Sequence, residues 1–226
     1  MMLKIPDVLT PDQVRQCREA LEQAEWADGR LTAGYVAESA KKNLQLPLDH
    51  PVGRQVGELI LNQLSSNPLF ISGALPQRVL PPRFNRYEGG GEYADHIDNA
   101  IFGVPGSSQR VRSDISATLF LSHPDEYEGG ELVVQDSYGS HTVKLPAGHM
   151  VVYPGSSLHR VTPVTRGVRL AAFFWIQSLV REDHRRAMLL ELDNAIQSVA
   201  KSHPGHGALP RLTGVYHNLI REWSDT

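Results

Sequence analysis

The feature that most constrains the fold of this chain is a series of short apolar or alternating runs between residues 69 and 178. Eight such runs are separated by Gly, Pro, Asn and Asp, the residues that favour turns. They read LPQRVL, PRFNRYE, ISATLFLS, GELVVQD, SHTVKL, HMVVYP, LHRVTPV and VRLAAFFWIQS. Short strands with turn residues between them are typical of a β-barrel or a double-sheet jelly roll. The sequence therefore predicts a mainly β core.

Helices are expected before this core. Thr10 can cap a first helix, with Pro11 in its first turn and Gln13 at the capping-box position. A second helix is predicted over residues 51–66, where apolar residues recur on one face. The intervening residues 27–50 are mixed in character and predict a loop with a strand or two.

Two further helices are predicted after the core, around the loop SHPGHGALP. The chain thus divides into an N-terminal segment, 1–68, a jelly-roll core, 69–178, and a helical tail, 179–226. One apolar stripe of the tail must be buried, either against the core or against a second copy of the chain. In the second case the C-terminal helices form a homo-oligomer. The stripe consists of Met188, Leu189, Leu192, Ile196 and Val199.

Composition excludes several classes of protein. With 226 residues, 41% of them hydrophobic and 21% charged, the chain matches a globular protein with one large domain, or with one domain and a small appendage. Its net charge of -3 gives no electrostatic reason to expect nucleic acid as a partner. No run of about 18 apolar residues predicts a membrane span, and the N-terminus lacks the pattern of a signal peptide. A single cysteine, Cys17, rules out an internal disulfide and a Cys-based zinc site. A cytoplasmic location is expected.

The triplet His96-Ile97-Asp98 is the first candidate for chemistry. Residues two apart on a strand project to the same face, so His96 and Asp98 can point together into the mouth of the core. A third metal ligand must come from elsewhere. Among the other core histidines, only His159 lies on a predicted strand that is followed by a short turn and a strand bearing an arginine, Arg169.

The spacing of these residues predicts a hairpin. If its turn centres near Thr165, position 159 pairs with 171 and 161 with 169, which places His159 and Arg169 diagonally on one face, roughly 7 Å apart. A register shifted by one residue would move Arg169 to the opposite face. Two histidines and one carboxylate on one face are the facial triad of non-haem Fe(II) oxygenases, and an arginine suits a carboxylate ligand.

With their flanking sequence these residues resemble a known family. The stretches RYEGGGEYADHID, LFLSHPDEYEGGEL and FFWIQSLVREDHRR resemble the Fe(II)- and 2-oxoglutarate-dependent dioxygenases, specifically the prolyl-4-hydroxylase-like branch and its bacterial PKHD-type hydroxylases of the PiuC kind. The resemblance runs over nearly the whole chain. It implies a double-stranded β-helix, Fe(2+) on His96, Asp98 and His159, 2-oxoglutarate on Arg169, O2 as co-reactant and L-ascorbate as reductant.

Two further features of the site each have two interpretations: the residue that hydrogen-bonds 2-oxoglutarate beside Arg169, and the segment 99–114. Many members of the superfamily have a serine or threonine two positions after the arginine, where this chain has Ala171. Tyr87 is our candidate for the missing hydrogen bond to 2-oxoglutarate; the alternative is an ordinary strand tyrosine. The Gly- and Ser-rich segment 99–114 carries Arg110 and Arg112 and is interpreted as a substrate-facing lid, or else as an idle surface loop.

The resemblance implies a hydroxylase that oxidises a C–H bond with release of succinate and CO2. No protein nucleophile is needed. The substrate would be a small molecule or peptide-like, and the PiuC resemblance suggests a siderophore-related compound and a link to iron homeostasis. Two alternatives remain open: a cupin-like metal enzyme that does not use 2-oxoglutarate, and a non-catalytic sensor of iron or 2-oxoglutarate.

Overall fold

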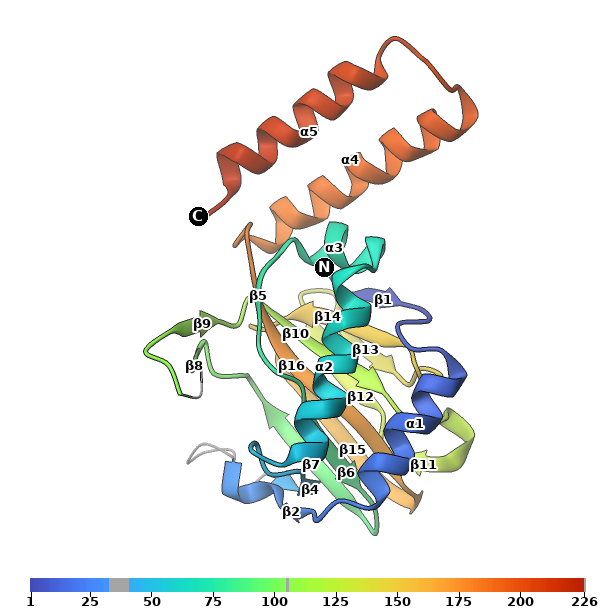
Figure 1. Ribbon diagram of the computed structural model, residues 1–226, viewed down its shortest axis with the longest axis vertical. Helices are drawn as coiled ribbons and strands as arrows, with labels where there is room; N and C mark the ends of the chain where they lie inside the picture. Colours follow the sequence, from blue (N-terminus) through green and yellow to red (C-terminus); the bar gives the residue numbers. More distant parts are fainter. Residues whose placement is uncertain (33–40, 105, 226) are drawn as a thin grey trace.

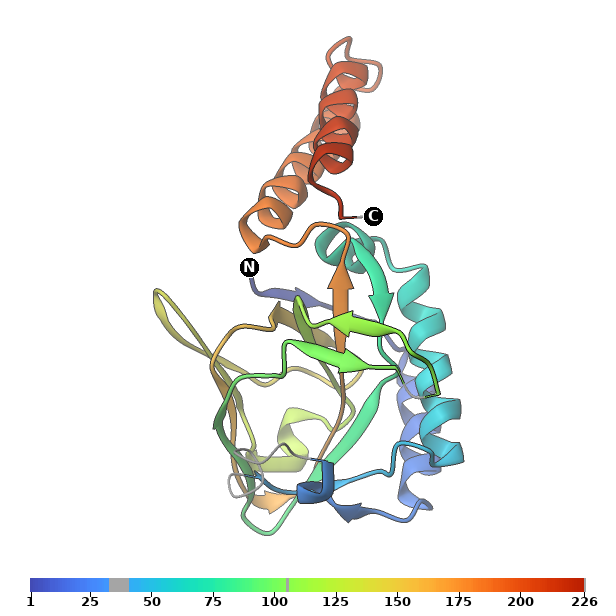
Figure 2. The ribbon, with the colours of Figure 1, turned by 90° about the vertical axis from the view of Figure 1, so that its left-hand side faces the viewer.

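Two antiparallel β-sheets lie face to face at the centre of the molecule (Figure 1). The computed structural model describes residues 1–32, 41–104 and 106–225. Helices cover one side of this sandwich, and a hairpin of two helices extends from one end (Figure 2). The predicted mainly β fold with flanking helices is therefore confirmed.

The larger sheet contains the central strands of the core. Its order is β1 (Leu3–Ile5), β14 (Met150–Pro154), β10 (Ile115–Phe120), β16 (Arg169–Ser178), β6 (Arg83–Tyr87), β4 (Leu44–Gln45) and β2 (Ala27–Asp28), with β5 (Pro76–Val79) also paired to β16. Strand β16 is buried along most of its length. It therefore has side chains on both faces that contribute to packing or to the site.

The smaller sheet faces it. Its order is β13 (Gly139–Val143), β12 (Leu132–Asp136), β15 (His159–Gly167), β7 (Gly91–His96) and β3 (Lys41–Lys42), with β11 (Tyr127–Gly129) also paired to β15. A separate hairpin is formed by β8 (Ile101–Gly103) and β9 (Arg110–Arg112). All eight predicted runs form strands. Of the mixed segment 27–50, residues 33–40 lie outside the described residues, and the rest contains β2, β3 and β4.

The N-terminal helices begin where their capping signals predict. Helix α1 (Pro11–Glu22) starts after Thr10 with the predicted capping box to Gln13, and α2 (Pro51–Ser65) occupies the predicted second position. Short 3-10 helices occur at Gly29–Thr32 and Pro124–Glu126. Helix α3 (Pro68–Ala74) was not predicted, since the β core was expected to start at residue 69. Asn67 caps this helix and Pro68 occupies its first turn, a start signal that the apolar pattern obscured.

Alternation along the central strands separates two packing regions. Leu170, Ala172 and Ile176 of β16 join the apolar core beneath α1 and α2, which cover one side of the sandwich (Figure 2). Phe173 and Trp175, on the other face of β16, line a cavity between the sheets. The period of two residues thus assigns one face of β16 to packing and the other to the site.

The predicted hairpin between β15 and β16 is wrong. Arg169 of β16 pairs with Tyr87 of β6, and His159 of β15 pairs with His96 of β7. Residues 159 and 171 therefore do not face each other across a ladder. The two strands belong to different sheets.

The physical reason is that neither strand has a free edge for the other. Strand β15 is flanked by β7 on one side and by β11 and β12 on the other, whereas β16 lies between β10 and β6. At Gly167, where φ is +74°, the chain turns from one sheet to the other. A Cβ atom there would lie 2.0 Å from a backbone carbonyl oxygen, so the turn requires glycine.

The C-terminal residues form the two predicted helices, α4 (Asp183–Ser202) and α5 (Leu209–Trp223). The pair extends away from the sandwich (Figures 1 and 2). Only its base contacts the core, where Val180 and Leu189 are buried together with Leu75. Within the described residues, no helix is both long and apolar enough to cross a membrane.

Candidate metal centre

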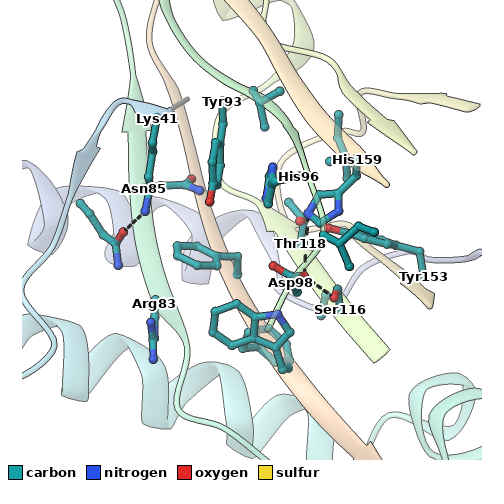
Figure 3. A pocket seen from close by; sticks show the side chains of 18 of the residues that line it. Lys41, Arg83, Asn85, Tyr93, His96, Asp98, Ser116, Thr118, Tyr153 and His159 are labelled. Carbon is teal, nitrogen blue, oxygen red and sulfur yellow. Dashed lines mark hydrogen bonds and ion pairs between the residues drawn. The ribbon is translucent and has the colours of Figure 1, made fainter. Parts of the chain in front are cut away.

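Two histidines face each other across neighbouring strands of the smaller sheet. His96 ends β7 and is the direct partner of His159, the first residue of β15. Their ring centroids are 4.1 Å apart. Asp98 follows His96 by two residues and turns toward the same point (Figure 3). One ligand atom from each of the three residues lies within 4.8 Å of the others, so the structure brings the predicted trio together.

Hydrogen bonds orient all three side chains. The Nδ1 atom of His96 lies 2.8 Å from the Ala94 carbonyl oxygen, and Nδ1 of His159 lies 3.0 Å from that of Ser157. An Nδ1–H donated to a carbonyl leaves Nε2 with its lone pair toward the shared point, the tautomer that metal binding requires. This arrangement would present both Nε2 atoms to a metal ion at that point.

Asp98 is held from the opposite sheet. The Ser116 hydroxyl on β10 donates a hydrogen bond of 2.6 Å to Asp98 Oδ2. The same carboxylate oxygen lies 3.8 Å from Nε2 of His159. Ser116 therefore fixes the carboxylate while leaving its other oxygen available.

The surroundings of His96 keep its imidazole neutral. Burial, together with the nearby His159, lowers the pKa of His96 to about 4. The His96 ring also stacks on Tyr93, with centroids 3.6 Å apart. Neutral imidazoles and an ionised carboxylate are the forms that bind a divalent cation, so the donor set fits such an ion.

A cavity of about 370 Å³ opens beside these ligands, between the two sheets. It is lined by the trio on one side and by residues of β6 and β16 on the other (Figure 3). Its size is at the lower end of the range for small-molecule sites. Three protein ligands facing a cavity leave further metal positions open to molecules that enter it.

Arg169 lies in the same cavity although its predicted hairpin does not exist. Its side chain is 1% exposed, and its guanidinium carbon lies 5.3 Å from the ring centroids of both Tyr87 and Phe120. Within the described residues, its Nε and Nη1 atoms are buried without a hydrogen-bond partner. A buried cation with unsatisfied donors is costly unless a ligand pairs with it. A carboxylate is the ligand that its planar fork fits best.

Tyr87 is the direct cross-strand partner of Arg169 and also lines the cavity. Burial raises the pKa of its hydroxyl, which therefore stays protonated and able to donate. Ala171 pairs with Asn85 on the same two strands. Asn85 donates to the Tyr87 hydroxyl at 3.4 Å. Strand β6 thus supplies polar side chains, Asn85 and Tyr87, next to position 171, where this chain has no side-chain hydroxyl.

The predicted lid forms the β8–β9 hairpin, apart from residue 105, which lies outside the described residues. Its contribution to the cavity wall is aromatic. Phe102 on β8 stacks on Trp175 of β16, with ring centroids 3.9 Å apart, and both rings line the cavity.

The two arginines of this segment lie elsewhere. Neither Arg110 nor Arg112 is among the residues that line the cavity. Arg112 forms an ion pair with Asp114 at 2.6 Å, and Arg110 is exposed. Both lie on β9, which pairs with the strand that carries Phe102.

Several lining residues were not predicted from the sequence. Ser116 and Trp175 lie on strands whose positions were predicted, and Arg83 and Asn85 precede Tyr87 on β6 at intervals of two residues. The alternation rule would have placed Arg83 and Asn85 on the same face as Tyr87. The two-residue spacing of Arg83, Asn85 and Tyr87 is visible in the sequence, but the sequence does not show which face of β6 points into the cavity.

Comparisons with known proteins agree with this geometry. Residues 82–177 match the family model described as the 2OG-Fe(II) oxygenase superfamily, and residues 183–225 match that of the PKHD-type hydroxylase C-terminal domain. The chain is 66% identical to a PKHD-type hydroxylase of Parvibaculum lavamentivorans and 58% identical to the PKHD-type hydroxylase PiuC of Pseudomonas aeruginosa. Each alignment covers 100% of both chains.

A solved structure has a similar fold at low sequence identity. It is a prolyl hydroxylase from Trichoplax adhaerens in complex with a peptide fragment of the hypoxia inducible factor oxygen degradation domain. The TM-score is 0.58 at 13% identity, and the match covers 83% of this chain and 86% of that one.

Proposed function

Since the chain belongs to the PKHD-type hydroxylases and is a 2-oxoglutarate-dependent dioxygenase, we propose that its Fe(2+) is held by His96, Asp98 and His159. The observation that carries this proposal is the convergence of their ligand atoms within 4.8 Å, with both histidines oriented through Nδ1. When bound, Fe(2+), 2-oxoglutarate and O2 supply the oxidation: a substrate C–H becomes C–OH while 2-oxoglutarate becomes succinate and CO2.

In this proposal Arg169 binds the distal carboxylate of 2-oxoglutarate. Its buried, unpaired Nε and Nη1 support the role, because a carboxylate would satisfy them. Gly130 leaves room for the Arg169 side chain, since a Cβ atom at position 130 would lie 3.0 Å from Arg169 Cδ. Tyr87 adds a hydroxyl donor beside the guanidinium. The residues of the chain thus bind and orient the reactants and exclude water, and none acts as a nucleophile.

The substrate is proposed to be a peptide-like or siderophore-related molecule, with L-ascorbate as reductant. The peptide in the similar prolyl hydroxylase structure supports the first class. The second, and the link to iron homeostasis, follow from the resemblance to the PiuC kind of hydroxylase. Addition of ascorbate should prolong turnover by keeping the metal reduced.

We also propose that the α4–α5 hairpin mediates self-association. Helix α5 has no buried residue, and Met188 and Val215 are each 51% exposed. Val215→Glu should shift the protein toward a smaller species in light scattering after size-exclusion chromatography. An unchanged mass for this variant, or a monomeric native protein, would contradict the proposal.

Succinate release tests the reaction directly. Protein loaded with Fe(2+) should convert 2-oxoglutarate to succinate, faster with a substrate from a panel of peptides, siderophores and cell extracts. Asp98→Ala should release none. Binding of 2-oxoglutarate without succinate under every condition would favour a sensor, and substrate oxidation that does not need 2-oxoglutarate would favour a cupin-like enzyme.

A further inference from the structure

Arg83 enters the cavity at a distance from the proposed 2-oxoglutarate anchor. It shares a face of β6 with Asn85 and Tyr87, and its cross-strand partner is Phe173. Four residues of strand, roughly 13 Å, separate it from Tyr87 and therefore from Arg169. Figure 3 shows Arg83 on the side of the cavity opposite His96 and His159. The cavity thus has an arginine at each end of one sheet face.

The guanidinium of Arg83 is held by aromatic rings and not by an acidic residue. Its central carbon lies 5.0 Å from the Trp175 ring centroid and 5.6 Å from that of Phe102. Within the described residues, the Arg83 side chain forms no ion pair or hydrogen bond, and the charge of Asp98 acts on it only through space. Stacking on rings fixes the plane of a guanidinium and leaves its N–H donors available at the edge.

Two other charged residues that line the cavity, Asp95 and Lys41, already contact partners within the protein. Asp95 forms an ion pair with Arg160 at 3.1 Å, and the ammonium of Lys41 donates to Gln45 at 2.7 Å. With a divalent metal and 2-oxoglutarate bound, the charges of metal, cosubstrate, Asp98 and Arg169 cancel. Two cations of the cavity then remain: Lys41, whose ammonium already donates to Gln45, and Arg83, which faces the space beside the metal. Burial lowers its pKa while Asp98 raises it, and a guanidinium stays charged at neutral pH.

We propose that Arg83 binds a carboxylate of the substrate, and that the adjoining apolar part of the substrate lies against the wall formed by Phe102, Phe173 and Trp175. This inference rests on the proposed function, because it places the substrate in the space that 2-oxoglutarate leaves free. The small cavity limits the bound part to a compact group. That group is a free organic acid or the carboxylate of a peptide.

Matched acid and amide probes test this inference. The protein is loaded with Mn(2+) in place of Fe(2+) and with N-oxalylglycine, an unreactive analogue of 2-oxoglutarate. Calorimetry then compares phenylacetate with phenylacetamide, N-acetylproline with its amide, and a Gly-Gly-Phe peptide with its C-terminal amide. Each pair keeps the shape of the probe and removes the charge.

At least one acid should bind about 10- to 100-fold more tightly than its amide, as expected for a charge-assisted contact. Arg83→Gln should abolish this preference and Arg83→Lys should retain part of it. Arg86→Gln is the matched control, because Arg86 lies on the same strand but pairs with Glu88 outside the cavity, and it should keep the preference. A preference confined to the free acids or to the peptides identifies the source of the carboxylate.

Three results would overturn the inference: no acid preferred over its amide, a preference that survives Arg83→Gln, or loss of Mn(2+) and N-oxalylglycine binding by Arg83→Gln, which would make Arg83 structural. Native protein that fails to bind Mn(2+) and N-oxalylglycine would instead contradict the proposed function. Native protein that binds both but shows no preference would contradict the inference alone.

Discussion

At the scale of single residues, the candidate metal site depends on partners that are not ligands. Ala94 and Ser157 offer backbone carbonyls to the two histidines, and Ser116 offers a hydroxyl to Asp98. Ala94 lies on β7 and Ser157 just before β15, each two residues before its histidine. Ser116 lies on β10 of the opposite sheet, and ligand spacing gives no sign of it. The sequence predicted the candidate ligands because their types and spacing are specific, whereas the Ser116 partner depends on how the sheets stack.

Ser116→Ala should weaken metal binding without altering the fold. The hydroxyl that orients Asp98 would be lost, and removal of such a partner typically lowers metal affinity 10- to 100-fold, by about 1.4–2.7 kcal/mol. Anaerobic Fe(2+) titration measures the change. Ser122→Ala serves as control, because this buried serine accepts a hydrogen bond from the Leu170 backbone N–H, away from the ligands. Equal affinities for native protein and Ser116→Ala would remove Ser116 from the site.

Cys17 should be unreactive in the native protein. Its side chain lies on the buried face of α1 and is 1% exposed, and burial raises the pKa of its thiol to about 11. Because the thiolate is the reactive form, iodoacetamide at pH 8 should label it only as the protein unfolds in guanidinium chloride. Rapid labelling of the folded protein would show that the packing of α1 against the sheet is loose.

At the scale of elements, strands were easier to predict than their pairing. Every predicted run is a strand, because alternation and turn residues are local signals. The β15–β16 hairpin was wrong because pairing is decided by strands distant in sequence: β6 and β10 occupy both edges of β16. Arg169 nevertheless reaches the cavity of His159, since it starts a strand whose inner face opposes the smaller sheet.

The base of the helical hairpin depends on Arg186. This arginine is 1% exposed; its Nη1 donates to the Val180 and Arg181 carbonyls at 2.9 and 2.7 Å, and its Nη2 donates to Asp183. Arg186→Met should leave those acceptors without donors and lower the free energy of unfolding by about 2–4 kcal/mol. Arg181→Met, with an exposed side chain, is the control.

Denaturant unfolding measures this cost, and limited proteolysis between residues 178 and 183 reports whether the hairpin has detached. If Arg186→Met resists protease and urea as well as Arg181→Met does, the hairpin is held by its apolar contacts alone. Those contacts involve Leu75, Val180 and Leu189.

At the scale of the whole molecule, one apolar core joins the N-terminal segment to the sandwich. Leu21 of α1 and Ile60 of α2 share a cluster with Leu119 and Phe174 of the larger sheet. The helices therefore support the sheet from behind while its other face carries the site. The division at residues 68 and 178 stays a prediction, although the core shows why the first segment would not be separable from the second.

The central claim is that metal and 2-oxoglutarate are held by different residues in one cavity. Anaerobic titration with Fe(2+) and then with 2-oxoglutarate tests it on two variants and a control. Asp98→Ala should lose stoichiometric Fe(2+) binding and keep its fold. Arg169→Ala should bind Fe(2+) nearly normally, with 2-oxoglutarate affinity lower by about one to three orders of magnitude, since a buried charge partner is removed.

The 2-oxoglutarate affinity of Arg169→Lys should lie between those of the native protein and Arg169→Ala. Lysine keeps the positive charge but cannot donate two parallel hydrogen bonds as a guanidinium does. Arg166→Ala, at an exposed arginine paired with Glu128, should match the native protein in both titrations. An Arg169→Ala variant that binds 2-oxoglutarate with native affinity, or an Asp98→Ala variant that binds Fe(2+) one to one, would contradict the account.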